Sequence, residues 1–211
     1  MLWSLIIILP ITVLLFLAMV YLNGLETISM PEHYSGWLLV LNFVLCVPPF
    51  LMLVIKDYRD EDVSTKEGVV FFLKQMGLVL LFSSLLYLIA VWGMIIFFIP
   101  TIIAFLFILI FPFFTEIKNM KEILRRTAIK IADENIGLIG DILVVISLNI
   151  MIWAAIMAVI QQFDNNIFAF LLIRVVMNMI IFPILYIYLT LRYRDENEFT
   201  SLSFDSRNED F

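Results

Sequence analysis

The residues from Met76 to Phe114 form a run of 39 consecutive positions without Asp, Glu, Lys or Arg. A helix that crosses the hydrocarbon core of a bilayer needs about 20 apolar residues, so this run is long enough for two. Backbone groups in lipid must be satisfied within helices or closed barrels. We therefore predict a helical hairpin. Its turn should lie between Trp92-Gly93 and Ile99-Pro100, and a break at Trp92-Gly93 gives two nearly equal halves.

The composition of the whole chain agrees with a lipid environment. Of its 211 residues, 63% are apolar and 15% are charged, whereas a soluble domain has about 45–50% and about 25%. We therefore predict an all-α, integral membrane six-helix bundle over residues 1–191, followed by an acidic disordered cytoplasmic tail at 192–211. The predicted spans are 5–22, 37–55, 76–92, 94–114, 139–160 and 167–191.

The second predicted span contains the pair Pro48-Pro49 in its second half. Proline has no backbone N–H, so the pair leaves carbonyl groups of the preceding turn without their helical donors. Such groups need other partners inside a membrane. We expect this half of the span to face protein rather than lipid.

The distribution of basic residues predicts the orientation. Of the 13 Lys and Arg residues, four lie at 56–74, five at 118–130 and three in the tail, whereas the loops at 23–36 and 161–166 have none. Positive residues that flank spans are retained on the cytoplasmic side. Six spans with both termini in the cytoplasm satisfy this rule, and Arg174 is the one basic residue left inside a span.

Residues 117–131 follow the 3.6-residue period of an amphipathic helix. The apolar positions are Ile117, Met120, Ile123, Leu124, Ala128 and Ile131, and the basic positions on the other arc are Lys118, Lys121, Arg125, Arg126 and Lys130. We expect this helix to lie along the inner leaflet. Its basic face would meet anionic lipid headgroups, at ~1 kcal/mol per residue, or dock a cytoplasmic partner.

Polar residues inside the last two spans are the main candidates for function, because an intramembrane ionisable group is costly unless it is paired. A short, symmetric turn between these spans places residues whose numbers sum to about 327 at equal depth. This relation pairs Asn149 with Asn178, Trp153 with Arg174, and Asp141 with Tyr186.

Three interpretations of this intramembrane polar layer remain open. The residues could clamp the helix hairpin through cation–π and interhelical hydrogen-bond contacts of roughly 0.5–2 kcal/mol each. They could instead line a passage for a substrate or ion, or lie at a subunit interface. Arg174 is also close enough to the outer end of its span to snorkel outward or to reach Asp164.

The sequence has no catalytic or metal-binding signature. Ser83 and Ser84 have no charged or histidine partner in their own or the adjacent hydrophobic segment, so no activated nucleophile is evident. The single Cys46 and the single His33 exclude a thiolate cluster and a multi-histidine site. No basic run with interleaved aromatic residues indicates nucleic acid binding. We expect a protein that is not an enzyme, with no cofactor and no metal.

Two segments carry a resemblance to a known family. Leu45-Cys46-Val47-Pro48 lies near the end of a span, and Ile110-Phe111-Pro112-Phe113-Phe114 precedes the amphipathic run 117–131. Over residues 36–191 this arrangement resembles the YesL-like family of small bacterial membrane proteins, and it is also similar to the membrane domain of some bacterial glycerophosphodiester phosphodiesterases. The acidic tail and Arg174 depart from that pattern.

The resemblance implies a multi-pass helical protein of the bacterial plasma membrane, often an accessory partner of a transport system. We therefore expect an accessory or permease-type subunit of a bacterial transport complex, as a homo-oligomer or with a membrane or cytoplasmic partner. The alternatives are a stand-alone immunity or envelope-protection protein against a membrane-active peptide, and a small self-sufficient permease.

Overall fold

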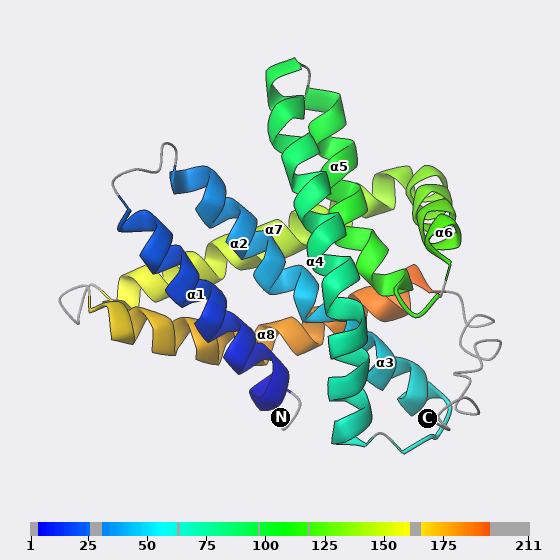
Figure 1. Cartoon of the computed structure of the whole chain (residues 1–211), viewed down its shortest axis with the longest axis horizontal. Helices are drawn as coiled ribbons and strands as arrows, with labels where there is room; N and C mark the ends of the chain where they lie inside the picture. The colour runs from blue at the N-terminus through cyan, green and yellow to red at the C-terminus, as the bar shows by residue number, and fades with distance from the viewer. Residues whose placement is uncertain are drawn as a thin grey trace.

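The computed structural model describes residues 4–25, 31–62, 64–96, 98–117, 119–160 and 166–194. Their elements are helical throughout (Figure 1). A π-helical turn at Ser4–Ile8 leads into α1 (Leu9–Asn23), followed by α2 (Pro31–Leu45), α3 (Val47–Tyr58), α4 (Thr65–Ile96), α5 (Phe98–Ile110), the 3-10 turn η2 (Phe111–Phe114), α6 (Met120–Asp133), α7 (Asn135–Ile160) and α8 (Ile167–Tyr193). The all-α prediction is confirmed for this part of the chain.

Four segments of the described chain are long and apolar enough to cross a membrane: Leu5–Asn23, His33–Tyr58, Thr65–Ile95 and Ile167–Tyr193. The segments Phe98–Phe114 and Ile150–Val159 are apolar but shorter. The predicted membrane character is therefore supported, whereas the count of six spans and the location of both termini stay predictions.

The helices form two diverging pairs (Figure 1). The α4–α5 hairpin rises to one side, and the antiparallel α7–α8 pair runs to the other, with α1 and α2 between them. The pairs come together near α3, the end of α5 and the C-terminal end of α8, where α3 contacts both α8 and η2.

The turn of the α4–α5 hairpin lies within the predicted interval but not at Trp92-Gly93. Helix α4 continues through these residues to Ile96, and α5 begins at Phe98. A Cβ atom on Gly93 would lie 2.9 Å from the backbone N of Thr101, and the Thr101 hydroxyl donates a 2.8 Å hydrogen bond to the carbonyl of Ala90. Gly93 therefore serves the close approach of two helices, and it does not form the turn.

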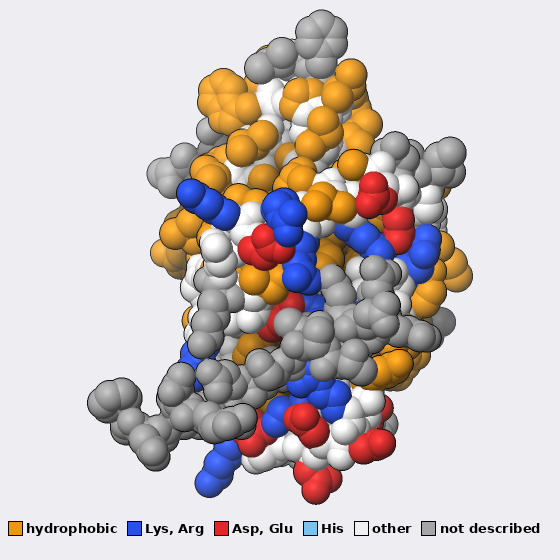
Figure 2. Space-filling view, turned by 90° about the vertical axis from the view of Figure 1, so that its right-hand side faces the viewer, with side chains coloured by type: hydrophobic (Ala, Val, Ile, Leu, Met, Phe, Trp, Pro, Cys, Tyr) orange, Lys and Arg blue, Asp and Glu red, His pale blue; other side chains and the backbone are white. Residues whose placement is uncertain are grey.

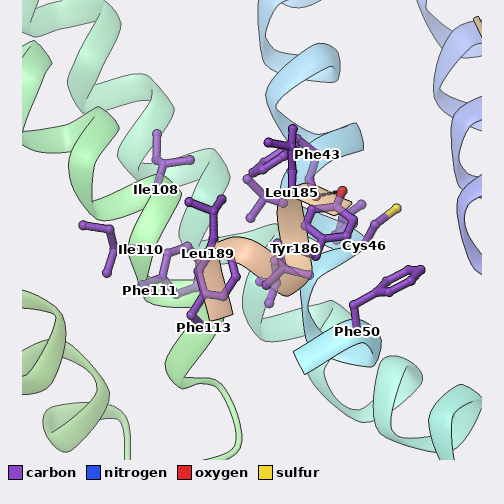
Figure 3. Close-up of a cluster of buried hydrophobic side chains, with 14 of the residues drawn as sticks. Phe43, Cys46, Phe50, Ile108, Ile110, Phe111, Phe113, Leu185, Tyr186 and Leu189 are labelled. Carbon is purple, nitrogen blue, oxygen red and sulfur yellow. Dashed lines mark hydrogen bonds between the residues drawn. The ribbon is translucent and has the colours of Figure 1, made fainter. Parts of the chain in front are cut away.

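The main hydrophobic core lies at the break between α2 and α3 (Figure 3). Pro48 and Pro49 occupy the first positions of α3, and Phe50 and Leu51 that follow them are buried. The prediction that this half of the span faces protein is confirmed. Phe43, Phe111, Phe113 and Tyr186 complete the core from α2, η2 and α8.

Charged side chains of both signs lie together on the face turned toward α6, while the upper part of that face is apolar (Figure 2). Lys56 at the end of α3 forms a 2.6 Å ion pair with Glu67 in the first turn of α4. Helix α8 extends to Tyr193, beyond the predicted boundary at 191, and Arg194 is buried. The remainder of the predicted tail, residues 195–211, lies outside the described residues.

Candidate functional site

A cavity of about 660 Å³ occupies the space between the diverging helix pairs. Its walls are apolar side chains of α2, α5, α7 and α8, among them Leu39, Phe105, Ile150, Ile156 and Phe170. Val44, Ile108 and Phe182 line the cavity and also belong to the hydrophobic core. The core therefore borders the cavity toward the charged end of the molecule, whereas the lining residues Met19, Ser35 and Phe170 lie near the α1–α2 and α7–α8 connections.

Among the described residues that line this cavity, Arg174 is the only ionisable one. It is half-buried on α8, and it also lines a second, small crevice between α1 and α2 beside Thr12 and Asn42. Within the described part of the chain, its guanidinium has neither an ion pair nor a hydrogen bond. A cation without a counter-ion in an apolar wall is costly, so this geometry favours an anionic group at this position.

Asn178 lies one helical turn from Arg174 on the same face of α8 and lines the same cavity. Asn178 is 3% exposed, and its Nδ2 atom has no hydrogen-bond partner among the described residues. A buried amide donor without an acceptor costs about 1–3 kcal/mol. Arg174 and Asn178, both predicted from the sequence, therefore present two donors to one cavity.

A third polar group at the cavity is Asn42 of α2, which the sequence analysis did not single out. The Thr12 hydroxyl donates a 3.1 Å hydrogen bond to its Oδ1, and both side chains are buried. This pair ties α1 to α2 beside Arg174. Asn42 could have been noticed in the sequence as an amide within the apolar run 37–55, but nothing in the sequence shows which helix its side chain contacts.

The predicted partners of Arg174 and Asn178 cannot be placed at the level of side chains. Trp153 and Asn149 belong to α7, but their side chains lie outside the described residues, as do Asp164 and most of the α7–α8 connection. The described α7 residues that line the cavity are Ile150, Ile152 and Ile156, and the last two pack against side chains of α8. The pairs Asn149–Asn178 and Trp153–Arg174 stay predictions.

The structure does not bring Asp141 to Arg174 or Asn178, the other members of the predicted polar layer whose side chains are described. Its carboxylate accepts a 3.1 Å hydrogen bond from Tyr188 and lies 3.7 Å from Arg192. Tyr188 is 14 residues from Arg174, or about 21 Å along the helix. Tyr186, which the depth relation places level with Asp141, points to α2 on another side of α8.

Asp141 instead belongs to a chain of ion pairs at the opposite end of α8. Lys130 lies 2.7 Å from Glu134, and Glu134 lies 3.3 Å from Arg192. Arg192 in turn approaches Asp141. This network joins the end of α6 to the beginning of α7 and the end of α8.

The predicted amphipathic helix is present as α6, and Ile123 and Thr127 form its buried face. Its basic side chains form more ion pairs and hydrogen bonds with acidic residues than the sequence suggests. Glu122 accepts hydrogen bonds from Arg125 and Arg126, and Lys130 is paired with Glu134. Lys118 lies outside the described residues. Within the described chain, Lys121 is the exposed basic residue of α6 whose side chain has no partner.

Searches with this chain give no positive identification. No protein-family model, no curated protein and no solved structure matches it. Among the described residues, no group of three or more His, Cys, Asp or Glu side chains could hold a metal ion. The resemblance to the YesL-like family and the absence of a cofactor or metal therefore stay expectations.

Proposed function

We propose that the chain is a non-enzymatic, multi-pass protein of the bacterial plasma membrane and works as an accessory or permease-type subunit of a transport complex. The observation that carries this proposal is the apolar cavity with Arg174 and Asn178 in its wall. Concave, mostly apolar spaces with a few convergent polar groups are typical ligand sites.

The exposed surface supports a lipid environment for this protein. Leu81, Leu88 and Ile95 of α4 and Leu172 and Ile184 of α8 are exposed along helices that are long enough to span a bilayer. Large exposed apolar areas mark surfaces that meet lipid or other protein. In this setting the cavity is accessible from the bilayer or from its outer face.

The packed core beside the cavity favours a subunit over a self-sufficient permease. The core residues Val44, Ile108 and Phe182 lie between the cavity and the charged end, so a bound molecule would have to displace packed side chains of the described core to pass through this chain. Movement across the membrane then requires a partner that opens the core or receives the molecule laterally. The exposed part of α6 around Lys121 is our proposed contact for a cytoplasmic partner.

The test is purification of the tagged, full-length chain from its own membranes in a mild detergent. We expect a complex of fixed stoichiometry whose other subunits include a transport protein. The variant Lys121→Glu should lose a cytoplasmic partner, whereas Lys66→Glu, on another exposed cytoplasmic segment by our topology, should retain it. A monodisperse lone monomer that still transports a substrate in vesicles contradicts the subunit proposal.

A further inference from the structure

We propose that the cavity binds a long-chain carboxylate, a molecule with one acyl chain and a single negative charge, with Arg174 as its counter-ion. The inference deepens the proposed function by naming the substrate class, and it takes from that proposal the idea that the cavity is the ligand site. The binding itself is a property of this chain.

The volume of the cavity limits the ligand to one chain. A water molecule occupies about 30 Å³ in the liquid, and a methylene group is of similar size, so a cavity of about 660 Å³ holds roughly twenty non-hydrogen atoms. A fatty acid of 16 to 18 carbons has this size. A two-chain phospholipid is more than twice as large, and only part of it would fit.

The charge of the lining limits the headgroup. Among the described residues that line the cavity, Arg174 is the single cation and none is acidic. A guanidinium presents a planar fork of donors that matches a carboxylate in a bidentate pair. A phosphate monoester carries about −1.5 to −2 charges near neutral pH and would leave part of its charge unbalanced here. One carboxylate matches one arginine.

The position of the two donors fits a headgroup above an acyl chain. Arg174 lies seven residues from the first residue of α8, or roughly 10 Å from its outer end. Asn178 lies one turn deeper and offers its unpartnered Nδ2 atom to the same space. Below Arg174, roughly 12 Å of helix separates the headgroup from Phe182 in the floor. This distance leaves an apolar wall along the first part of the chain, and the remainder has to bend within the cavity.

The test uses the full-length protein in nanodiscs of phosphatidylcholine and radiolabelled palmitate as the probe. Hexadecan-1-ol has the same chain without the charge, and palmitoyl-lysophosphatidylcholine has the same chain with a phosphodiester headgroup. We expect palmitate to bind at least about tenfold more tightly than either, because hydrogen bonds to a charged group contribute about that factor. Arg174→Gln should lose this difference, and Arg174→Lys should keep part of it.

A second pair of variants tests the cavity without touching the arginine. Ile150 lines the cavity and Met151 does not, although both are exposed neighbours on α7. Ile150→Trp should reduce palmitate binding at least about tenfold by filling the cavity, and Met151→Trp should bind as the wild type does. If Arg174→Gln does not fold, this matched pair decides whether palmitate occupies the cavity, and Arg174→Lys decides whether the arginine contributes.

Several results would overturn the proposal. One is that palmitate does not bind to the wild-type protein. Others are that hexadecan-1-ol binds as tightly as palmitate, or that the lysophospholipid binds more tightly than palmitate. The last is that a folded Arg174→Gln variant binds palmitate with the affinity of the wild type. The experiment separates this inference from the proposed function. A chain that binds palmitate as expected but purifies alone contradicts the subunit role and supports the ligand assignment. A stable transport complex that does not bind palmitate supports the subunit role and contradicts the ligand assignment.

Discussion

The Tyr186 hydroxyl donates a 2.8 Å hydrogen bond to the backbone carbonyl of Phe43, a residue 143 positions earlier in the chain (Figure 3). The Tyr186 ring packs between Phe43 and Phe50, with ring centroids 5.1 Å and 5.3 Å away. Phe43 lies in the last turn of α2, just before the proline break. The end of α8 thus stabilises an interrupted helix and forms part of the core that borders the cavity.

Tyr186→Phe should lower the free energy of unfolding by about 1–3 kcal/mol, because the ring remains while the buried carbonyl of Phe43 loses its donor. The measurement is the unfolding midpoint of the purified protein in detergent. Tyr21→Phe is the matched control, since Tyr21 is an exposed residue of α1. Equal midpoints for the two variants would show that the hydrogen bond adds nothing.

Gly93→Ala should destabilise the α4–α5 hairpin by about 1–3 kcal/mol, a typical cost of overpacking. The new methyl group would lie 2.8 Å from the Thr101 hydroxyl and 2.9 Å from its backbone N. Gly77 provides the control on the same helix, because a methyl group there meets nothing within 4 Å. Gly77→Ala should be neutral or stabilising by up to about 1 kcal/mol. Thermal melts of both variants test the contrast.

Features that depend on local pattern were predictable from the sequence. The proline pair in the second span predicts a break that faces protein, and the 3.6-residue period predicts α6. Both are present because local backbone chemistry and amphipathicity determine them. The hairpin at 76–114 and the interval that contains its turn were also predictable, but the exact position of the turn was not. From the sequence, Gly93 suggests the end of a helix. Only its contact with Thr101 shows that a glycine inside α4 allows α5 to approach closely.

Contacts between distant helices were not predictable, and these define the candidate site. Neither the bond from Thr12 to Asn42 nor that from Tyr186 to Phe43 follows from periodicity, because helix packing decides which faces meet. The depth relation in the last hairpin places Asp141 level with Tyr186, and in the structure Asp141 is bonded to Tyr188, two residues further along α8. These two positions are about 200° apart around a helix, so a small error in register changes the partner.

Arg194→Met should destabilise the protein strongly, because Arg194 and Glu116 form an ion pair whose side chains are 0% and 2% exposed. The Arg194 guanidinium also donates a 3.1 Å hydrogen bond to the carbonyl of Phe113. Removal of one partner leaves a buried charge, at a cost of about 3–5 kcal/mol. The double variant Arg194→Met with Glu116→Met should recover most of this loss. Unfolding midpoints of both variants provide the measurement, and no recovery would contradict the argument.

Glu122 on α6 should titrate far below an ordinary glutamate. Hydrogen bonds from Arg125 and then from Arg126 lower its pKa from 4.5 to about 2. Because the pKa is lower in the folded protein, the stabilisation is complete above about pH 4.5 and is lost as the pH falls toward 2. Titration by carboxyl-carbon NMR measures the value directly. Arg125→Gln should raise the pKa of Glu122, while Lys121→Gln should change it little. A value near 4.5 in the wild type would contradict the pairing.

Cysteine labelling can test which side of the membrane each segment lies on, because the single native cysteine should not react with the reagent. Cys46 is 0% exposed and should not react with a membrane-impermeant maleimide. Lys121→Cys lies on an exposed position of α6 and should be labelled only after the cells are opened, if basic segments are cytoplasmic. Tyr34→Cys, exposed near the beginning of α2 in a segment without basic residues, should be labelled in intact cells. Labelling of Lys121→Cys in intact cells would invert the topology and would place the cavity on the cytoplasmic side.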